Sequence, residues 1–536
     1  MHDGPVRSAS LALATLLFVL FLTFLDNTIV TVVLAQVQGD LHASVNQLQW
    51  VVNGYALAFA SLMLSFGTLG DLLGRKKVML TGVAVFCAGS VIAAVAPDPR
   101  VLIAGRVVMG IGAAASEPGT LSMIRQLYPD RAERARSLGI WAAVSSLGLA
   151  LGPLIGGLLV YGWSWRAIFW FNVFFGLVAF TSAALVLPET ADPVKARFDY
   201  AGALLGALSL GSLTFATILG ETQGYATWWI DLLYALSAVA AVTFVLVELR
   251  VDNPVLNVRY FKRRAFAGSN AIACTVYFGT FAIFFFVALY VQVVGSSSSL
   301  RTALDFVPMA FGMVLAAVFT GRWVAVWGPR VPMATGCFLG GVGIILTDIM
   351  ISPNAGVAQI GWTMFLAGTG VGMAMVPVTS AALGSVPSQH SGMAASATNT
   401  SRELGAVVGV AVLGSIVNGQ LTVNLVHRLT AIGIPKQFQS LVVSAVTTGS
   451  YQGGAKNAVT KDPAIAHIVH EVITAAYGAF GRGLDISLSL AGGLLLASGF
   501  LALATIYGRR LHLERVNSAN GHLLHLSVVG EPGTEQ

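Results

Sequence analysis

Apolar residues occur along this chain in stretches of about twenty, separated by short polar segments. A stretch of that length can cross the roughly 30 Å hydrocarbon core of a bilayer as a helix. The pattern predicts about fourteen spans, at 11–34, 48–69, 78–96, 101–124, 135–161, 167–187, 201–219, 231–249, 267–294, 303–327, 331–351, 360–383, 394–417 and 484–507. The predicted fold class is therefore an all-α polytopic membrane protein.

Composition and charge support this prediction. Of the 536 residues, 56% are hydrophobic and only 10% are charged, against roughly 25% charged residues in soluble domains. Lys and Arg gather in alternate loops, whereas the short loops of the other side hold only Arg100, Arg166 and Arg301. The positive-inside rule then predicts that both termini are cytoplasmic. The net charge of +6 follows from this bias, so it indicates topology and not nucleic-acid binding.

The two halves of the chain look related. The basic turn after the second span has a counterpart at 321–330, after the tenth span. If spans one to six repeat as spans nine to fourteen, spans seven and eight are an insertion between the halves. The predicted units are an N-terminal six-helix bundle (1–190), a two-helix insertion with cytoplasmic flanks (191–265), a C-terminal six-helix bundle with an extracellular loop at 418–483 (266–510), and a cytoplasmic tail (511–536).

The turn between the second and third spans carries a specific motif. Residues 67–80 read G-T-L-G-D-L-L-G-R-K-K-V-M-L. They closely resemble the G-x-L-x-D-x-x-G-R-[RK] signature of the major facilitator superfamily, although Leu72 stands where a basic residue is common. The resemblance implies a conformational gate, whereas the alternative is an ordinary positive-inside loop. The candidate gate residues are Gly67, Asp71, Gly74, Arg75 and Lys76.

Asp26 lies about two-thirds of the way along the first span. A carboxylate at such depth costs on the order of 2.5–3.5 kcal/mol on insertion scales, and it normally faces a cavity or a partner. Residues 25–30, L-D-N-T-I-V, resemble the L-D-x-T-[IV]-V opening of the fourteen-span drug–proton antiporters of this superfamily. The resemblance implies that Asp26 binds and releases the coupled proton. The alternative is a carboxylate that only anchors helix packing.

Arg106, in the fourth span, is the candidate partner of Asp26. It begins the sequence R-V-V-M-G-I-G, which resembles the R-x-x-x-G-x-G of the same transporters. The first span rises and the fourth descends, so the two residues are expected at roughly the same depth. We expect a direct or water-bridged pair, against the alternative that Arg106 extends to the outer headgroups.

The fifth span contains G-L-A-L-G-P-L-I-G-G at 148–157, which matches the G-x-x-x-G-P-x-x-G-G signature of exporters in the superfamily. Glycines four residues apart share one helix face and allow a second helix to approach closely, and a proline favours a kink. The resemblance implies export, whereas generic small-residue packing would explain the glycines alone. The motif residues are Gly148, Gly152, Pro153, Gly156 and Gly157.

Other polar residues within spans are weaker candidates. Glu403, in the thirteenth span, is either a proton or substrate site or half of a structural ion pair, and Glu117 has the same alternatives. Tyr290 and Gln292, in the aromatic ninth span, either line an apolar substrate cavity with Asp26, Glu117 and Glu403 or pack toward lipid. The stretch 165–172, W-R-A-I-F-W-F-N, is interpreted as a structural anchor.

From these motifs, the chain is identified as a member of the fourteen-span drug–proton antiporters. The resemblance implies a monomeric exporter in the cell membrane, here a bacterial inner membrane, which exchanges protons for hydrophobic or cationic compounds by alternating access. One alternative is export of an endogenous metabolite or lipid, and another is a non-transporting receptor or scaffold. The sequence has neither a P-loop nor a metal-ligand spacing, so no enzymatic activity, cofactor or metal is expected.

Overall fold

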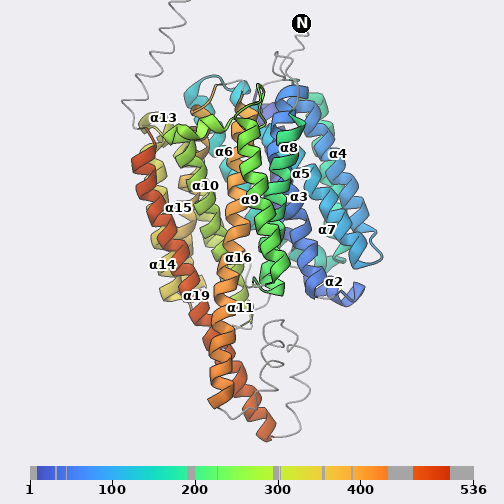
Figure 1. Cartoon of the computed structure of the whole chain (residues 1–536), viewed down its shortest axis with the longest axis vertical. Helices are drawn as coiled ribbons and strands as arrows, with labels where there is room; N and C mark the ends of the chain where they lie inside the picture. Colours follow the sequence, from blue (N-terminus) through green and yellow to red (C-terminus); the bar gives the residue numbers. More distant parts are fainter. Residues whose placement is uncertain are drawn as a thin grey trace, which may run out of the picture.

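The computed structural model describes residues 9–30, 33–43, 45–189, 199–225, 227–293, 301, 304–352, 357–387, 390–431 and 463–507. Figure 1 shows an all-helical bundle whose long helices run side by side. Within these ranges, thirteen helices are long and apolar enough to span a membrane, and a bent pair raises the number to fourteen. The predicted fold class and number of spans are therefore confirmed.

The helices follow the predicted spans closely. The first six spans and the short helix after the first are α1 (Ala9–Ile29), α2 (Leu34–Leu41), α3 (Val45–Leu73), α4 (Arg75–Ala94), α5 (Pro99–Leu127), α6 (Arg131–Gly162) and α7 (Arg166–Val186). The next two are α8 (Tyr200–Gln223) and α9 (Trp228–Glu248). The remaining elements are the 3₁₀ helix η2 (Val258–Lys262), α10 (Arg264–Ala282), the π-helical turn η3 (Ile283–Val287), α11 (Ala288–Val293), α13 (Val307–Trp327), α14 (Arg330–Met350), α15 (Val357–Gly384), α16 (Ser391–Ala431) and α19 (Pro463–Thr505).

Local sequence explains where the helices nearest the motifs begin and end. Gly74 adopts a φ of 110°, which side chains disfavour, so α3 ends just before it and α4 begins just after it. Asp98 caps α5 by accepting hydrogen bonds from the backbone nitrogens of Arg100 and Val101, at 2.8 and 3.2 Å. Within α6, Arg136–Leu149 and Leu154–Gly162 are bent by 40° in the segment that contains Pro153.

The two halves contact each other through matching helices. The second span of the first half, α3, packs against α16, which is the fifth span of the second half. The fifth span of the first half, α6, packs against α13, which is the second span of the second half. Helices α8 and α9, the predicted insertion, pair with each other, and α8 also packs on α3 and α16. Helix α8 therefore lies beside the contact between α3 and α16.

Three details differ from the predicted elements. The first span ends at Ile29, and the chain then forms the separate short helix α2. The ninth span is interrupted by a π-helical turn. The spans before and after the predicted outer loop belong to longer helices. Of these, α16 has 41 residues, or about 60 Å at 1.5 Å per residue, twice a hydrocarbon core. Figure 1 shows α16 and α19 extending together below the bundle.

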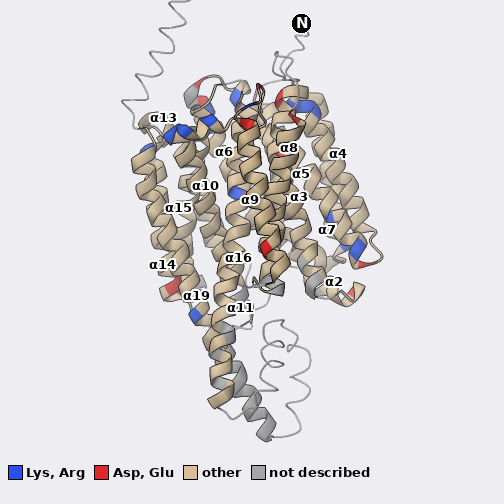
Figure 2. Ribbon diagram, viewed as in Figure 1, with Lys and Arg blue, Asp and Glu red and all other residues tan. Residues whose placement is uncertain are grey.

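Charged residues are concentrated at the two ends of the bundle. Figure 2 shows many Lys and Arg at the upper end, where α3 meets α4, and mainly uncharged residues along the helices between the ends. We call the upper end the α3–α4 end. The helix flanks carry apolar side chains such as Leu232, Val239 and Val242, each at least 60% exposed, as lipid contact requires. The predicted tail 511–536 and much of the predicted outer loop lie outside the described residues.

Candidate functional site

Asp26 is fully buried between α1, α5 and α7. Its Oδ2 atom lies 2.6 Å from Nη1 of Arg106, so the two residues form a direct ion pair. Its Oδ1 atom accepts a hydrogen bond from Nδ2 of Asn172, also at 2.6 Å. Both oxygens of the carboxylate thus have a donor, which offsets part of the cost of burying a charge.

Arg106 is 1% exposed and is held by two groups of α3. Its Nε atom donates to the backbone oxygen of Val51 at 2.9 Å. Its guanidinium carbon lies 4.5 Å from the centre of the Tyr55 ring, within the range of a cation–π interaction. The pair expected between Arg106 and Asp26 is present, and the burial of Arg106 rules out the extended conformation toward the headgroups.

Asn172 is a functional candidate that sequence reasoning missed. Asn172 ends the stretch 165–172, whose first residue, Trp165, is held in place. The Nε1 atom of Trp165 donates to Oδ2 of Asp40 in α2 at 2.9 Å. Asn172 lies seven residues after Trp165, two turns along α7, and its side chain contacts Asp26. The signal in the sequence was the stretch W-R-A-I-F-W-F-N itself, which ends at Asn172 but was interpreted only as a structural anchor.

The glycine motif of α6 brings this helix close to α1. A Cβ atom on Gly148 would lie 2.9 Å from Cβ of Phe24, and one on Gly152 would lie 2.0 Å from Oγ1 of Thr28. That hydroxyl donates to the backbone oxygen of Leu149 at 2.9 Å, which joins the two helices directly. The motif therefore sets the position of the α1 segment that carries Asp26.

The remaining motif positions contribute differently. A Cβ atom on Gly157 would meet nothing within 4 Å, so close packing does not require a glycine there. Gly156 is buried. The side chain of Pro153 lies outside the described residues. Gly148 and Gly152 are thus the motif positions at which α6 closely approaches α1.

At the α3–α4 end, Asp71 joins the two halves. Its Oδ2 atom accepts a hydrogen bond from the backbone nitrogen of Met393, in the first turn of α16, at 3.1 Å. Its Oδ1 atom accepts hydrogen bonds from Nε and Nη2 of Arg75 at 2.9 and 2.6 Å. Arg75 also donates to Oγ of Ser391 at 3.2 Å. A Cβ atom on Gly67 would lie only 1.5 Å from Oγ of Ser396, so α3 and α16 touch there.

The turn between α3 and α4 contacts the end of α7 through Lys76 and Gly74. The Nζ atom of Lys76 donates to the backbone oxygen of Ala184 at 2.7 Å, and its backbone nitrogen donates to Oε1 of Glu189 at 3.2 Å. The same carboxylate lies 2.5 Å from where a Cβ atom of Gly74 would be. All five gate residues predicted from the sequence therefore lie in one contact region.

A further contact between the halves was not expected from the sequence. Arg125, in the last turn of α5, donates to the backbone oxygens of Leu383 and Val386 at 2.7 and 3.1 Å. Leu383 lies in the last turn of α15, where a helix carries partial negative charge, and Val386 follows the helix. Arg125 thus adds a second polar connection between the halves at the α3–α4 end.

A second buried polar cluster lies between the halves, away from the ends. Glu117 of α5 is 2% exposed, and Arg402 and Glu403 of α16 are 2% and 5% exposed. Glu117 is close enough to interact electrostatically with both residues of α16. Arg402 donates from Nη1 to Oδ1 of Asn399 at 2.8 Å and from Nη2 to Oγ1 of Thr379. None of the ion pairs in the described ranges includes Arg402.

Tyr290, predicted to line the substrate cavity, contacts the last helix of the bundle. The Tyr290 ring stacks on the Phe480 ring of α19, with 5.9 Å between their centres. Tyr290 is 7% exposed, so its ring is buried among the C-terminal helices. The side chain of Gln292 lies outside the described residues.

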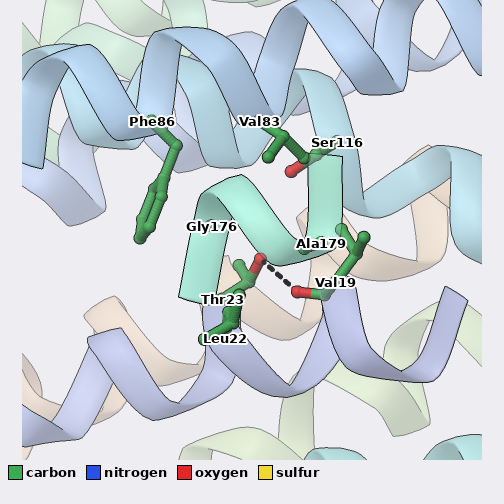
Figure 3. Close-up of a pocket in the computed structure, with 8 residues that line it drawn as sticks. All are labelled: Val19, Leu22, Thr23, Val83, Phe86, Ser116, Gly176 and Ala179. Atoms are coloured by element: carbon green, nitrogen blue, oxygen red, sulfur yellow. Dashed lines mark hydrogen bonds between the residues drawn. The ribbon is translucent and has the colours of Figure 1, made fainter. Parts of the chain in front are cut away.

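A small pocket lies within the N-terminal helices (Figure 3). Its polar lining includes Thr23, whose hydroxyl donates to the backbone oxygen of Val19 at 3.2 Å, and Ser116. The cavity volume is only about 10 Å³, far below the roughly 300–1,000 Å³ usual for sites of drug-sized ligands. The pocket is therefore too small to be the substrate cavity.

Comparisons with known proteins identify the family of this chain. Residues 16–410 match the family described as the Major Facilitator Superfamily. The chain is 30% identical over 506 residues to the multidrug resistance protein Stp of Mycobacterium tuberculosis (strain CDC 1551 / Oshkosh), covering 94% of this chain and 92% of that protein. It is 34% identical over 426 residues to the methylenomycin A resistance protein of Bacillus subtilis (strain 168), covering 78% of this chain and 90% of that protein.

The fold also resembles a solved structure. The crystal structure of the human organic anion transporter MFSD10 (TETRAN) aligns with 93% of this chain and 100% of that chain, at a TM-score of 0.58. The sequences are 14% identical, so this likeness concerns the fold alone.

Proposed function

Because this chain belongs to the major facilitator superfamily, we propose that it is a proton-coupled exporter of hydrophobic or cationic drug-like compounds. The family makes it a cell-membrane transporter and not an enzyme. The relatives named as multidrug and antibiotic resistance proteins support drug export. The observation that carries the proposal is the buried group of Asp26, Arg106 and Asn172 within the N-terminal helices.

Asp26 is the proposed proton-binding residue. A carboxylate that alternates between a hydrated and a dry environment binds and releases a proton, because burial disfavours its charge and a nearby cation favours it. Arg106 is the counter-charge, and Asn172 orients the carboxylate through its second oxygen. Glu403 and Glu117, between the halves, are the proposed carboxylates of the substrate site, where Glu403 also takes part in proton coupling.

The contacts at the α3–α4 end are the proposed cytoplasmic gate. With the basic end inside, both termini are cytoplasmic, and the contacts of Asp71 and Arg125 close the inner side. Opening this side requires those hydrogen bonds to break as the halves rock about the central cluster. The monomer contains all of these groups, so we propose that one chain is the transporting unit.

The test is transport by the purified full-length protein in proteoliposomes. An inwardly or outwardly directed pH gradient is imposed, and a panel of cationic, neutral and anionic hydrophobic compounds is supplied with a fluorescent pH indicator in the lumen. Substrate-dependent proton movement opposite to compound movement is expected for some cationic or neutral members. Compound transport without any proton movement would contradict antiport. Movement restricted to metabolites or lipids would favour the alternative of an endogenous substrate.

A further inference from the structure

Buried polar atoms without hydrogen-bond partners gather around the central cluster. In the described part of the chain they include Oε2 of Glu117, the hydroxyl of Tyr277 and Nδ2 of Asn399. The hydroxyl of Tyr55, which interacts electrostatically with Glu117 and Glu403, is a further one. Buried polar groups normally have partners, so such a concentration requires an explanation. These atoms come from both halves, at the place where a transported molecule has to bind.

Arg402 occupies an unusual position within this cluster. Its guanidinium carbon lies 5.1 Å from the centre of the Trp141 ring of α6 and 5.7 Å from that of the Tyr277 ring of α10. Both distances are within the range of cation–π contacts. One ring therefore comes from each half, and the cation lies between them. A slot of this kind, formed by aromatic faces, suits organic cations in general.

The hydrogen-bond partners of Arg402 carry no charge. Its two hydrogen bonds go to the neutral side chains of Asn399 and Thr379, and no carboxylate of the described ranges pairs with it. Both bonds are charge-assisted through the guanidinium, but neither acceptor carries the negative charge that would complete an ion pair. Arginine also has a long, flexible side chain, so its head group can adopt other positions.

The charges around the slot favour a second cation. Glu117 and Glu403 interact electrostatically with each other and with Arg402, so two carboxylates face one guanidinium. The remaining charged groups nearby, Asp26 and Arg106, neutralise each other in a direct pair. When both glutamates are ionised, the cluster lacks one positive charge, and a buried unpaired charge is costly.

We propose that Arg402 holds the place of a cationic substrate: its guanidinium fills the slot between Trp141 and Tyr277 when the site is empty, and an organic cation with flat apolar groups displaces it. This inference rests on the proposed function, which supplies the kind of compound that binds in the slot. The entering cation gains contacts with the two rings and with the two carboxylates. Arg402 returns to the slot when the cation leaves, which promotes release.

The proposal predicts that removing the charge of Arg402 strengthens binding. Tetraphenylphosphonium and tetraphenylborate have the same shape and opposite charge, so they separate charge from apolar contact. Binding of each is measured by titration calorimetry to full-length protein in lipid nanodiscs, with protein-free nanodiscs as the reference. Arg402→Gln should bind tetraphenylphosphonium on the order of tenfold more tightly than wild type, the size of one charge–charge interaction in a shielded site. It should bind tetraphenylborate no more tightly.

Matched variants complete the test. Arg402→Lys keeps the charge and should show no gain for the cation. Trp141→Leu and Glu403→Gln should weaken cation binding several-fold, whereas Trp170→Leu, at an outward-facing position that is 48% exposed, should not. Melting temperatures identify any variant that is unfolded, and the Trp141 and Glu403 variants test the slot without changing Arg402.

Three results would overturn the proposal. These are no gain in Arg402→Gln, an equal gain for both probes, or no binding of tetraphenylphosphonium to wild type and variants. The measurement uses no proton gradient. Loss of proton coupling in proteoliposomes would therefore contradict the proposed antiport while the binding results still decide the role of Arg402.

Discussion

Asp71 accepts a hydrogen bond from the backbone nitrogen of Met393 at 3.1 Å, although 322 residues separate them in the sequence. The contact sets a carboxylate on the N-terminus of α16, where a helix carries partial positive charge. Such a charge contributes about 0.3–1 kcal/mol when exposed and up to about 2 kcal/mol when partly buried. Since roughly 1.4 kcal/mol changes a population ratio tenfold, this one contact can set the balance between two conformations.

Asp71→Asn should shift the protein toward the state in which the α3–α4 end is open. The amide keeps the size of the side chain but loses the charge that favours the N-terminus of α16 and the pair with Arg75. Turnover should fall more than substrate binding. Spin labels on the α3–α4 turn and on the start of α16, with distances measured by pulsed electron resonance, report the populations. Identical distance distributions in wild type and variant would make Asp71 an ordinary loop residue.

Gly67→Ala should prevent the halves from closing at the same end. The new Cβ atom would lie 1.5 Å from Oγ and 2.6 Å from Cβ of Ser396, so rotating the serine cannot relieve the overlap and α16 has to move. The expected result is a transport rate reduced at least tenfold, with longer distances between the same spin labels. Adding Ser396→Gly should restore part of the rate.

The control for this prediction is Gly493→Ala. Its Cβ atom would meet nothing within 4 Å, so helix packing should be unaffected. If both alanine variants transport at the wild-type rate, the contact between α3 and α16 is not required for the transport cycle.

Arg106→Ala should reduce transport and change its pH dependence. The variant removes the counter-charge of Asp26 and leaves the hydrogen bond from Asn172 to the carboxylate. A removed partner of a buried charge pair typically costs 3–5 kcal/mol, so stability should fall as well. Arg106→Lys keeps the charge but not the planar contact with Tyr55, and it should retain more activity. A pH profile identical to wild type in the alanine variant would reject the functional pairing.

The sequence was sufficient to predict the parts of the site that depend on depth in the membrane. Asp26 and Arg106 lie on spans of opposite direction, so counting residues from the span ends places them at one level, and they pair. The gate residues could be grouped because they are adjacent in the sequence or follow a known motif. The α3–α4 turn also has a local cause, since Gly74 needs a positive φ.

Contacts between distant helices could not be derived in this way. Asn172 and Arg125 reach their partners only because of how α7 packs on α1 and how α5 meets α15. Trp141 and Tyr277 come together with Arg402 from three helices, and an aromatic residue in an apolar span gives no signal that distinguishes a slot from lipid-facing packing. For Tyr290, the same ambiguity left cavity lining and lipid-facing packing open, and the structure stacks its ring on Phe480.

The central claim of this account is that Asp26 binds the coupled proton, and Asp26→Asn tests it most directly. Asparagine can still accept a hydrogen bond from Arg106 and donate or accept with Asn172, but it cannot exchange a proton. The variant is purified, reconstituted in proteoliposomes and supplied with a pH gradient and a transported compound. We predict that it inserts normally and still binds the compound, while pH-driven transport and substrate-dependent proton movement are abolished. Full pH-driven transport by the asparagine variant would contradict the claim.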